Sequence, residues 1–357
     1  MSERADERTG GSGSRRALMV GVQILGFLGG VGVLVWVVLE AFSEKNRALI
    51  SRLGDASVGE VALLLGLSVA TLALNGSMFW VTLWPERRIS HMDVQATNAI
   101  STLLSYLPFK VGLICRVAIH NRRDGVPLLT IGAWFVAVGA IVITSLGPVF
   151  VASVVRGGVD AWWWAISLGG VTVVTAGLLL VSGFFAHERG MRRIHAMLDP
   201  IPIGALRRFM RTESFARLHA GFGMLAHPWA TVAATLMRLA DIAVQAARFV
   251  VAAGVLGVTM GWPDALVFAV TYFIIGMVSP FGMVGTREGG TVGVYAALGI
   301  SLTVGADAGG ADPLKLIVLF VTATESLAFL AGGAFGVAWL RADRLLLRRV
   351  GKGESEA

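Results

Sequence analysis

The sequence predicts an all-α polytopic membrane protein, with six spanning helices and two re-entrant broken helices in two inverted repeats. Three observations predict this fold. The composition is far more apolar than that of soluble proteins. Eight long apolar stretches follow one another along the chain, and two of them are interrupted by proline and glycine. The basic residues gather in the gaps on one side of the predicted membrane.

The composition excludes several classes of protein. Of 357 residues, 55% are hydrophobic and 15% are charged, against about a quarter charged in soluble domains. The net charge of +7 would suit nucleic acid, but the basic residues lie between apolar runs, which is typical of membrane topology. The single cysteine, Cys115, excludes an intramolecular disulfide and a cysteine-based zinc site. We expect no metal, no cofactor and no nucleic-acid partner.

Six uninterrupted stretches have the length of about 20 residues that a helix needs to cross the hydrocarbon core. Residues 1–16 before them and residues 342–357 after them are polar and are expected to be tails, the first of them disordered. The predicted spans are residues 17–40, 58–84, 128–155, 161–186, 228–257 and 313–340.

Two further stretches, 97–119 and 265–300, are each predicted to form two half-helices around a break. Proline removes a helix donor and clashes with the preceding turn, and glycine permits the turn conformations that follow. The interrupting residues are Pro108 and Gly112 in the first stretch, and Pro280, Gly282 and Gly285 in the second.

Charge placement favours re-entrant hairpins over full crossings at these breaks. If the N-terminus is cytoplasmic and both hairpins return to the side they entered from, the cytoplasmic segments hold 20 of the 30 Lys and Arg residues. The outside segments then hold 4. By the positive-inside rule we expect six crossings and cytoplasmic termini, in a bacterial cytoplasmic (inner) membrane. The alternative is one long broken helix at each interrupted stretch.

The order of elements repeats along the chain. Residues 17–156 give span, span, hairpin, span, and residues 157–341 give the same order. Because each half crosses the membrane an odd number of times, the second half is inverted, and its hairpin enters from outside. The second repeat also holds a cytoplasmic connector, 187–217, with seven arginines against three acids. We expect this connector to lie on anionic headgroups.

Inverted repeats with paired interrupted helices point to a transport site near the bilayer midplane. Half-helix N-termini present free N–H groups and a positive dipole end to an anion. The span 228–257 carries four polar residues on one helical face, and arginine suits bidentate phosphate binding. A salt-bridge stripe that only fixes packing is the alternative. The four residues are Arg238, Asp241, Gln245 and Arg248.

Other candidate headgroup-binding residues lie at the breaks and in the last span. Arg116 and Arg287 follow the two breaks and Lys110 lies within the first, with snorkelling to headgroups as the alternative. Glu288, beside Arg287, is a headgroup-site residue or a charged cap. Glu325 is a candidate proton carrier, a partner for an arginine, or a carboxyl kept neutral by burial.

Two weaker patterns predict helix packing. Asn75 suits an interhelical hydrogen bond, and Gly26 and Gly30 suit a close helix contact. Neither a zinc-protease HExxH motif nor a P-loop occurs in the sequence, so we expect no catalytic residues and no enzymatic activity.

The residues around the two breaks resemble the two signatures of the lysylphosphatidylglycerol synthetase membrane-domain family, over roughly residues 17–340. The resemblance implies a flippase-like domain that moves charged or glycosylated lipids between leaflets. It also implies that this chain, which has no aminoacyltransferase domain, does not make lysyl lipids. The matching residues are Asn98, Leu107, Pro108, Gly112, Arg116 and Gly125, then Ser279, Pro280, Gly282, Gly285, Arg287, Glu288, Leu298 and Gly299.

The sequence departs from the family pattern at two places. Leu113 stands where the family often has glutamate, and Ala133-Trp134-Phe135 stands where it has an acidic-basic signature. Either the lipid recognised differs or the activity is altered.

The leading hypothesis is therefore a flippase for an anionic phospholipid or a polyprenyl-phosphate-linked glycolipid, with membrane lipids as its partners. The alternative is a non-transporting scaffold that binds an envelope-lipid or glycan-synthesis enzyme through the basic segment 187–217. A membrane glycosyltransferase is disfavoured, because no outside loop is long enough to house donor chemistry.

Overall fold

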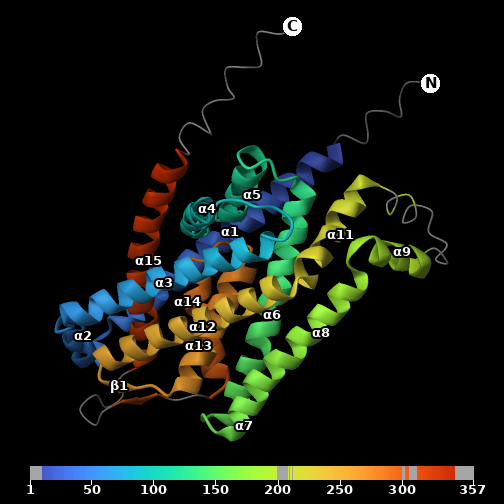
Figure 1. Cartoon of the computed structure of the whole chain (residues 1–357). Helices are drawn as coiled ribbons and strands as arrows, with labels where there is room; N and C mark the ends of the chain where they lie inside the picture. The colour runs from blue at the N-terminus through green and yellow to red at the C-terminus, as the bar shows by residue number, and fades with distance from the viewer. Residues whose placement is uncertain are drawn as a thin grey trace.

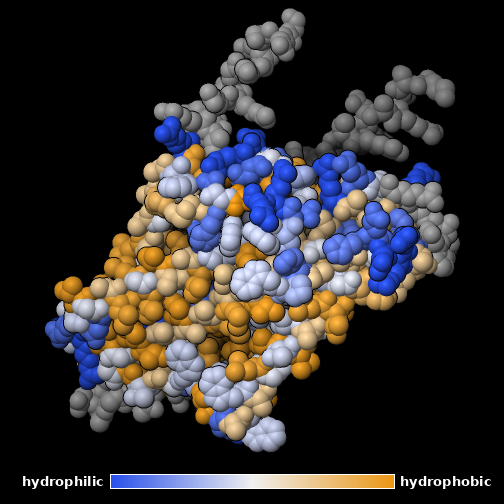
Figure 2. Space-filling model, viewed as in Figure 1, coloured by the Kyte–Doolittle hydropathy of each residue, from blue (hydrophilic) through white to orange (hydrophobic). Residues whose placement is uncertain are grey.

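The computed structural model describes residues 10–198, 208, 210, 212–299, 302–304 and 312–341, and most of these are helical (Figure 1). Hydrophobic side chains form a belt across the middle of the molecule, and hydrophilic side chains gather at its upper end (Figure 2). The all-α membrane fold predicted from composition is confirmed.

Five helices are long and apolar enough to cross a membrane. They are α1 (Gly10–Ala41), α3 (Val58–Leu83), α6 (Leu128–Arg156), the continuous helix Ala161–Phe185 and α15 (Pro313–Leu340). The helix Ala161–Phe185 consists of α7 (Ala161–Trp164), a π-helical turn (Ala165–Gly169) and α8 (Gly170–Phe185).

The remaining predicted span, 228–257, forms α12 (Pro228–Val255), whose 28 residues have the length for a crossing but carry three charged side chains. One expectation is corrected at the start of the chain. The helix α1 already begins at Gly10, so residues 10–16 of the segment predicted to be disordered are helical. No proline interrupts the backbone there. Residues 1–9 and 342–357 of the predicted tails lie outside the described part.

The remaining elements are short. A two-residue antiparallel ribbon, which the sequence did not predict, joins the loops after α12 and α14. Of the predicted connector 187–217, the structure describes one helix and the start of another. The short elements are a 3-10 turn (Glu44–Asn46), α2 (Arg47–Gly54), α4 (His91–Leu104), α5 (Val111–Arg122), α9 (His187–Leu198), α11 (Glu213–Ala226), α13 (Trp262–Val278), α14 (Thr286–Ala297), β1 (Val258–Thr259) and β2 (Thr303–Val304).

The helices α3 and α12 pack against each other at the centre. The last helix of each predicted repeat packs on the broken stretch of the other: α15 lies on α4, and α6 lies on α13. Likewise α15 contacts α3 as α6 contacts α12.

Both interrupted stretches form helical hairpins. A first tip, residues 105–110, joins α4 to α5, and a second tip, residues 279–285, joins α13 to α14. The four helices have 14, 12, 17 and 12 residues. At 1.5 Å per residue they are about 18–26 Å long, which is shorter than the roughly 30 Å hydrocarbon core.

The first tip turns differently from the prediction. Two non-glycine residues, Phe109 (φ 64°) and Lys110 (φ 52°), adopt the left-handed conformation directly after Pro108. Gly112 lies inside the first turn of α5, so its assignment to the break is corrected. A Cβ on Gly112 would lie 2.1 Å from the carbonyl oxygen of Ser101. Glycine is therefore needed here for the close approach of α4 and α5.

The second tip turns at the predicted glycines and contacts the first. Gly282 has φ 101° and Gly285 has φ 71°, both left-handed. The backbone N–H of Met283 donates to the carbonyl oxygen of Ser105 at 3.2 Å. A Cβ on Gly282 would lie 3.0 Å from the carbonyl oxygen of Tyr106. The two tips therefore meet backbone to backbone.

The helix α1 holds the second tip from its other side. A Cβ on Gly285 would lie 1.6 Å from the carbonyl oxygen of Gly30, and one on Gly26 would overlap the ring of Phe281. The close contact predicted for Gly26 and Gly30 is confirmed, and its partner is the second tip.

We expect Gly285→Ala to lower the free energy of unfolding by about 3 kcal/mol, because it adds a backbone clash to left-handed strain. Gly299→Ala is the matched control: Gly299 also has a positive φ of 65°, but a Cβ there meets nothing within 4 Å. The control should cost about 1 kcal/mol. Thermal unfolding in detergent measures both, and equal costs would contradict the packing of α1 on the second tip.

Candidate functional site

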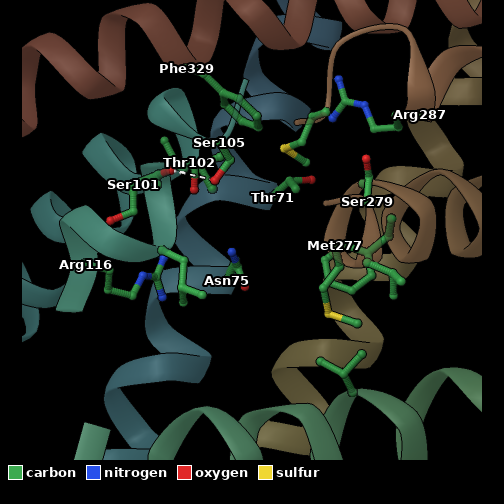
Figure 3. Close-up of a pocket in the computed structure, with 18 of the residues that line it drawn as sticks. Thr71, Asn75, Ser101, Thr102, Ser105, Arg116, Met277, Ser279, Arg287 and Phe329 are labelled. Carbon is green, nitrogen blue, oxygen red and sulfur yellow. Dashed lines mark hydrogen bonds between the residues drawn. The ribbon is translucent and has the colours of Figure 1, made fainter. Parts of the chain in front are cut away.

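A cavity of about 560 Å³ lies between the two tips, within the size range of small-molecule sites. Its walls come from α3, α4 and α5 on one side and from α13, the second tip and α15 on the other, with α6 and α12 completing them. Figure 3 shows Arg116 and Asn75 on one side, and Met277, Ser279 and Arg287 on the other.

Arg116 is buried in the cavity wall without an acidic partner. The α5 helix positions this side chain, which is 7% exposed, with its guanidinium 3.8 Å from the ring centroid of Phe79. The guanidinium donates a hydrogen bond to Oδ1 of Asn98. No carboxylate forms an ion pair with it in the part of the chain that the structure describes. Arg116 is thus a desolvated and uncompensated cation.

Asn98 holds this arginine from α4. Its own amide Nδ2 donates to the carbonyl oxygen of Leu72 at 2.9 Å, and Asn75 donates to its Oδ1 at 3.3 Å. The interhelical hydrogen bond predicted for Asn75 is therefore confirmed. The resemblance includes Asn98, but its contact with Arg116 emerges only in three dimensions, because 18 residues separate the two.

On the opposite wall, Arg287 belongs to a buried ion-pair network. Its Nη1 lies 2.5 Å from Oε1 of Glu325, and Oε2 of Glu325 lies 2.7 Å from Nη2 of Arg248. The guanidinium of Arg287 also lies 3.9 Å from the ring centroid of Tyr272 and donates to the hydroxyl of Tyr106 at 3.4 Å. The network therefore joins α12, α14 and α15 to the first tip.

Glu288 supports this network from outside the lining of the cavity. It lies 3.3 Å from Arg287 and accepts a hydrogen bond from Thr322 at 3.1 Å.

The polar stripe on α12 divides into two parts. All four of its residues are buried, as one shared face predicts. Asp241 and Gln245 line the cavity, whereas the stripe's two arginines lie behind its wall. Arg238 contacts Asp241 at 2.5 Å and stacks on Phe273 at 3.6 Å, and Arg248 contacts Glu325. Both arginines therefore form buried ion pairs, as the alternative interpretation of the stripe as a packing salt-bridge network predicts.

The remaining candidate, Lys110, connects the first tip to the end of α13 at the edge of the cavity. Its ammonium donates to the carbonyl oxygen of Met277 at 2.7 Å. Exposed apolar side chains border the cavity at both tips, and the most exposed is Val278 at 65%. These exposed lining residues are Leu107, Leu113, Met277 and Val278.

Sequence reasoning missed the aromatic lining. Phe79 and Tyr272 line the cavity and contact its arginines, and Tyr106 contacts Arg287 from outside the lining. An aromatic residue in an apolar stretch carries no signal that separates this role from ordinary packing. Within the described residues, no group of three or more His, Cys, Asp or Glu side chains could hold a metal ion.

The comparisons with known proteins place the chain in one family. The family described as "Lysylphosphatidylglycerol synthase TM region" matches residues 23–311. No curated protein and no solved structure matches the chain.

We expect Glu325→Gln to destabilise the protein by about 3–5 kcal/mol. Arg248 loses its buried carboxylate partner, and Arg287 keeps only Glu288 of its two carboxylate partners. The control Glu213→Gln removes an exposed pair with Arg217 and should cost less than about 1 kcal/mol. Thermal unfolding in detergent compares the two.

The double variant Glu325→Met with Arg248→Met leaves Arg287 paired to Glu288 and should recover part of that loss. A single variant as stable as the wild type would contradict the network.

Proposed function

Because the chain belongs to the lysylphosphatidylglycerol synthase TM-region family, we propose that it is a lipid flippase of the bacterial cytoplasmic membrane. Its substrate is an anionic phospholipid or a polyprenyl-phosphate-linked glycolipid. The observation that carries this proposal is the uncompensated Arg116 on a cavity bordered by exposed apolar side chains. The phosphate of the headgroup binds Arg116, and the lipid tails stay along the apolar border.

Electrostatics supports an anionic headgroup. A buried charge without a counter-charge costs several kcal/mol, and an anion in the cavity relieves that cost. The helices α5 and α14 begin directly after the two tips, so their positive N-terminal ends lie beside the cavity. A headgroup held between the tips therefore meets a positive potential from both sides.

The proposed topology has six crossings, counting α12, with the two hairpins entering from opposite faces. The hairpin helices are too short to cross the core, and the tips meet inside the bundle. The matched packing of α15 on α4 and of α6 on α13 supports two inverted repeats, 17–156 and 157–341. In this topology both termini are cytoplasmic.

The proposal requires no catalytic residue and no cofactor. A scaffold for an envelope-synthesis enzyme is the second candidate, and the exposed arginines of α9 favour it: Arg189, Arg192 and Arg193. Under this alternative, charge reversal within 187–217 abolishes partner binding and no lipid moves.

Cysteine labelling tests the re-entrant topology. In a Cys115→Ser background, we expect Arg88→Cys and Arg122→Cys to react with a membrane-impermeant maleimide from the cytoplasmic face. Gly261→Cys and Leu298→Cys should react from the opposite face. The two members of a pair flank one hairpin, so reaction from different faces would contradict re-entry there.

Reconstitution into liposomes tests transport. We expect the protein to accelerate the movement of acyl-labelled phosphatidylglycerol between leaflets, measured by dithionite quenching. Arg116→Gln should slow this movement roughly ten- to hundredfold, the worth of one charge-assisted hydrogen bond. The exposed Arg217→Gln is the control and should leave the rate unchanged. If no tested anionic lipid moves faster than in protein-free liposomes, the flippase proposal fails.

A further inference from the structure

The buried charges in and behind the wall of the cavity have one positive charge in excess, because four arginines are set against three carboxylates. They are Arg116, Arg238, Arg248 and Arg287 against Asp241, Glu288 and Glu325. Arg287 is paired with Glu325, and the charge of Asp241 is matched by Arg238 behind the wall. Lys110 is only partly buried at the edge of the cavity, where water screens its charge. Among the described lining residues, Arg116 is then the one buried cation without a carboxylate partner.

This charge count limits what the cavity can hold. One negative charge neutralises Arg116, but a second would enter a desolvated space with no buried cation left for it. A cationic amine would meet Arg116 as a like charge, and the carboxylates of Asp241 and Glu325 are already paired. The cavity is therefore matched to a single negative charge.

The neutral part of the wall offers acceptor oxygens. The hydroxyl of Ser105 donates to the Ser101 carbonyl, which leaves its lone pairs open. The hydroxyl of Ser279 donates to the Gly282 carbonyl and accepts from the backbone N–H of Phe281 at 3.3 Å, which leaves one lone pair open. Asn75 uses its Nδ2 on Asn98, and its Oδ1 has no donor among the described residues. Such oxygens accept hydrogen bonds from hydroxyl groups of a headgroup.

We infer that the site selects lipids whose headgroup carries one phosphodiester charge and free hydroxyl groups, and that it rejects diphosphates and headgroups with a cationic amine. The inference rests on the proposed function and names its substrate class. Two kinds of lipid carry this chemistry, a diacyl phosphoglycerol and a polyprenyl phosphate with one sugar.

A lipid panel in proteoliposomes tests the inference. Acyl-labelled phosphatidylglycerol is compared with acyl-labelled phosphatidylethanolamine by dithionite quenching. Polyprenyl-phosphate glucose is compared with its diphosphate counterpart by periodate oxidation of the outer-leaflet sugar. We expect at least one hydroxylated phosphodiester to move at least roughly tenfold faster than its counterpart. A preference within the phosphatidylglycerol comparison identifies a diacyl lipid as the substrate, and a preference within the polyprenyl comparison identifies a polyprenyl lipid.

The variant Asn98→Asp tests the charge count directly. It changes the side chain's shape little and places a carboxylate where Oδ1 of Asn98 already accepts from Arg116. The rate ratio of the preferred lipid to its counterpart should fall at least roughly tenfold, because Arg116 is then neutralised. Asn121→Asp is the control on α5, the helix of Arg116, since the Asn121 amide donates to the Val126 carbonyl and does not line the cavity.

Equal rates across each pair, or an unchanged ratio in Asn98→Asp, would overturn the charge selection while leaving the flippase proposal intact. Movement of no lipid above the protein-free rate would overturn both.

Discussion

The contact between the two tips is the constraint on which the rest of this structure depends. In the proposed topology the tips lie at membrane depth, where non-helical backbone needs partners from the protein because lipid supplies none. The tips provide these partners for each other and for themselves: Met283 bonds to Ser105, and Gly282 accepts from Ser279 and Thr286. Four helices end at these tips, and the cavity is the space left between them.

The buried charges follow from the same arrangement. Glu325 joins Arg248 to Arg287 and so fixes the second hairpin against α12 and α15. Such a network is costly to break, so it keeps the tips in register. Arg116 differs because its partner is the neutral amide of Asn98, which orients it without cancelling its charge. In the proposed function, the cost of burying this charge is what favours the binding of an anion.

Much of the fold could be predicted from the sequence, because the thickness of the membrane fixes the length of apolar helices. The predicted span 313–340 is observed as Pro313–Leu340, and 161–186 as Ala161–Phe185. The second tip could be predicted because only glycine takes its conformations easily, at Gly282 and Gly285. The break of the first hairpin at Pro108 was predicted, but the conformation of its tip could not be, because the left-handed residues there are Phe109 and Lys110 rather than glycines.

The site was only partly predictable for a related reason. Helical spacing placed four polar residues on one face of α12, but it could not say which of them reach the cavity. Which residues of this face reach the cavity depends on Phe273 and Glu325, which are distant in sequence. Arg238 stacks on the ring of Phe273, and Arg248 forms an ion pair with Glu325, so both arginines lie behind the wall. Likewise the charge of Arg116 has no carboxylate partner among the residues that the structure describes, and only packing decides this.

The position of a bound lipid tests the central claim most directly. A cryo-electron microscopy map of the protein in nanodiscs with phosphatidylglycerol or polyprenyl-phosphate glucose should show phosphate density within hydrogen-bond distance of Arg116. The tail density should lie along Leu107 and Val278. Lipid density confined to the outer surface of the bundle, with the space beside Arg116 filled only by water, would contradict the account.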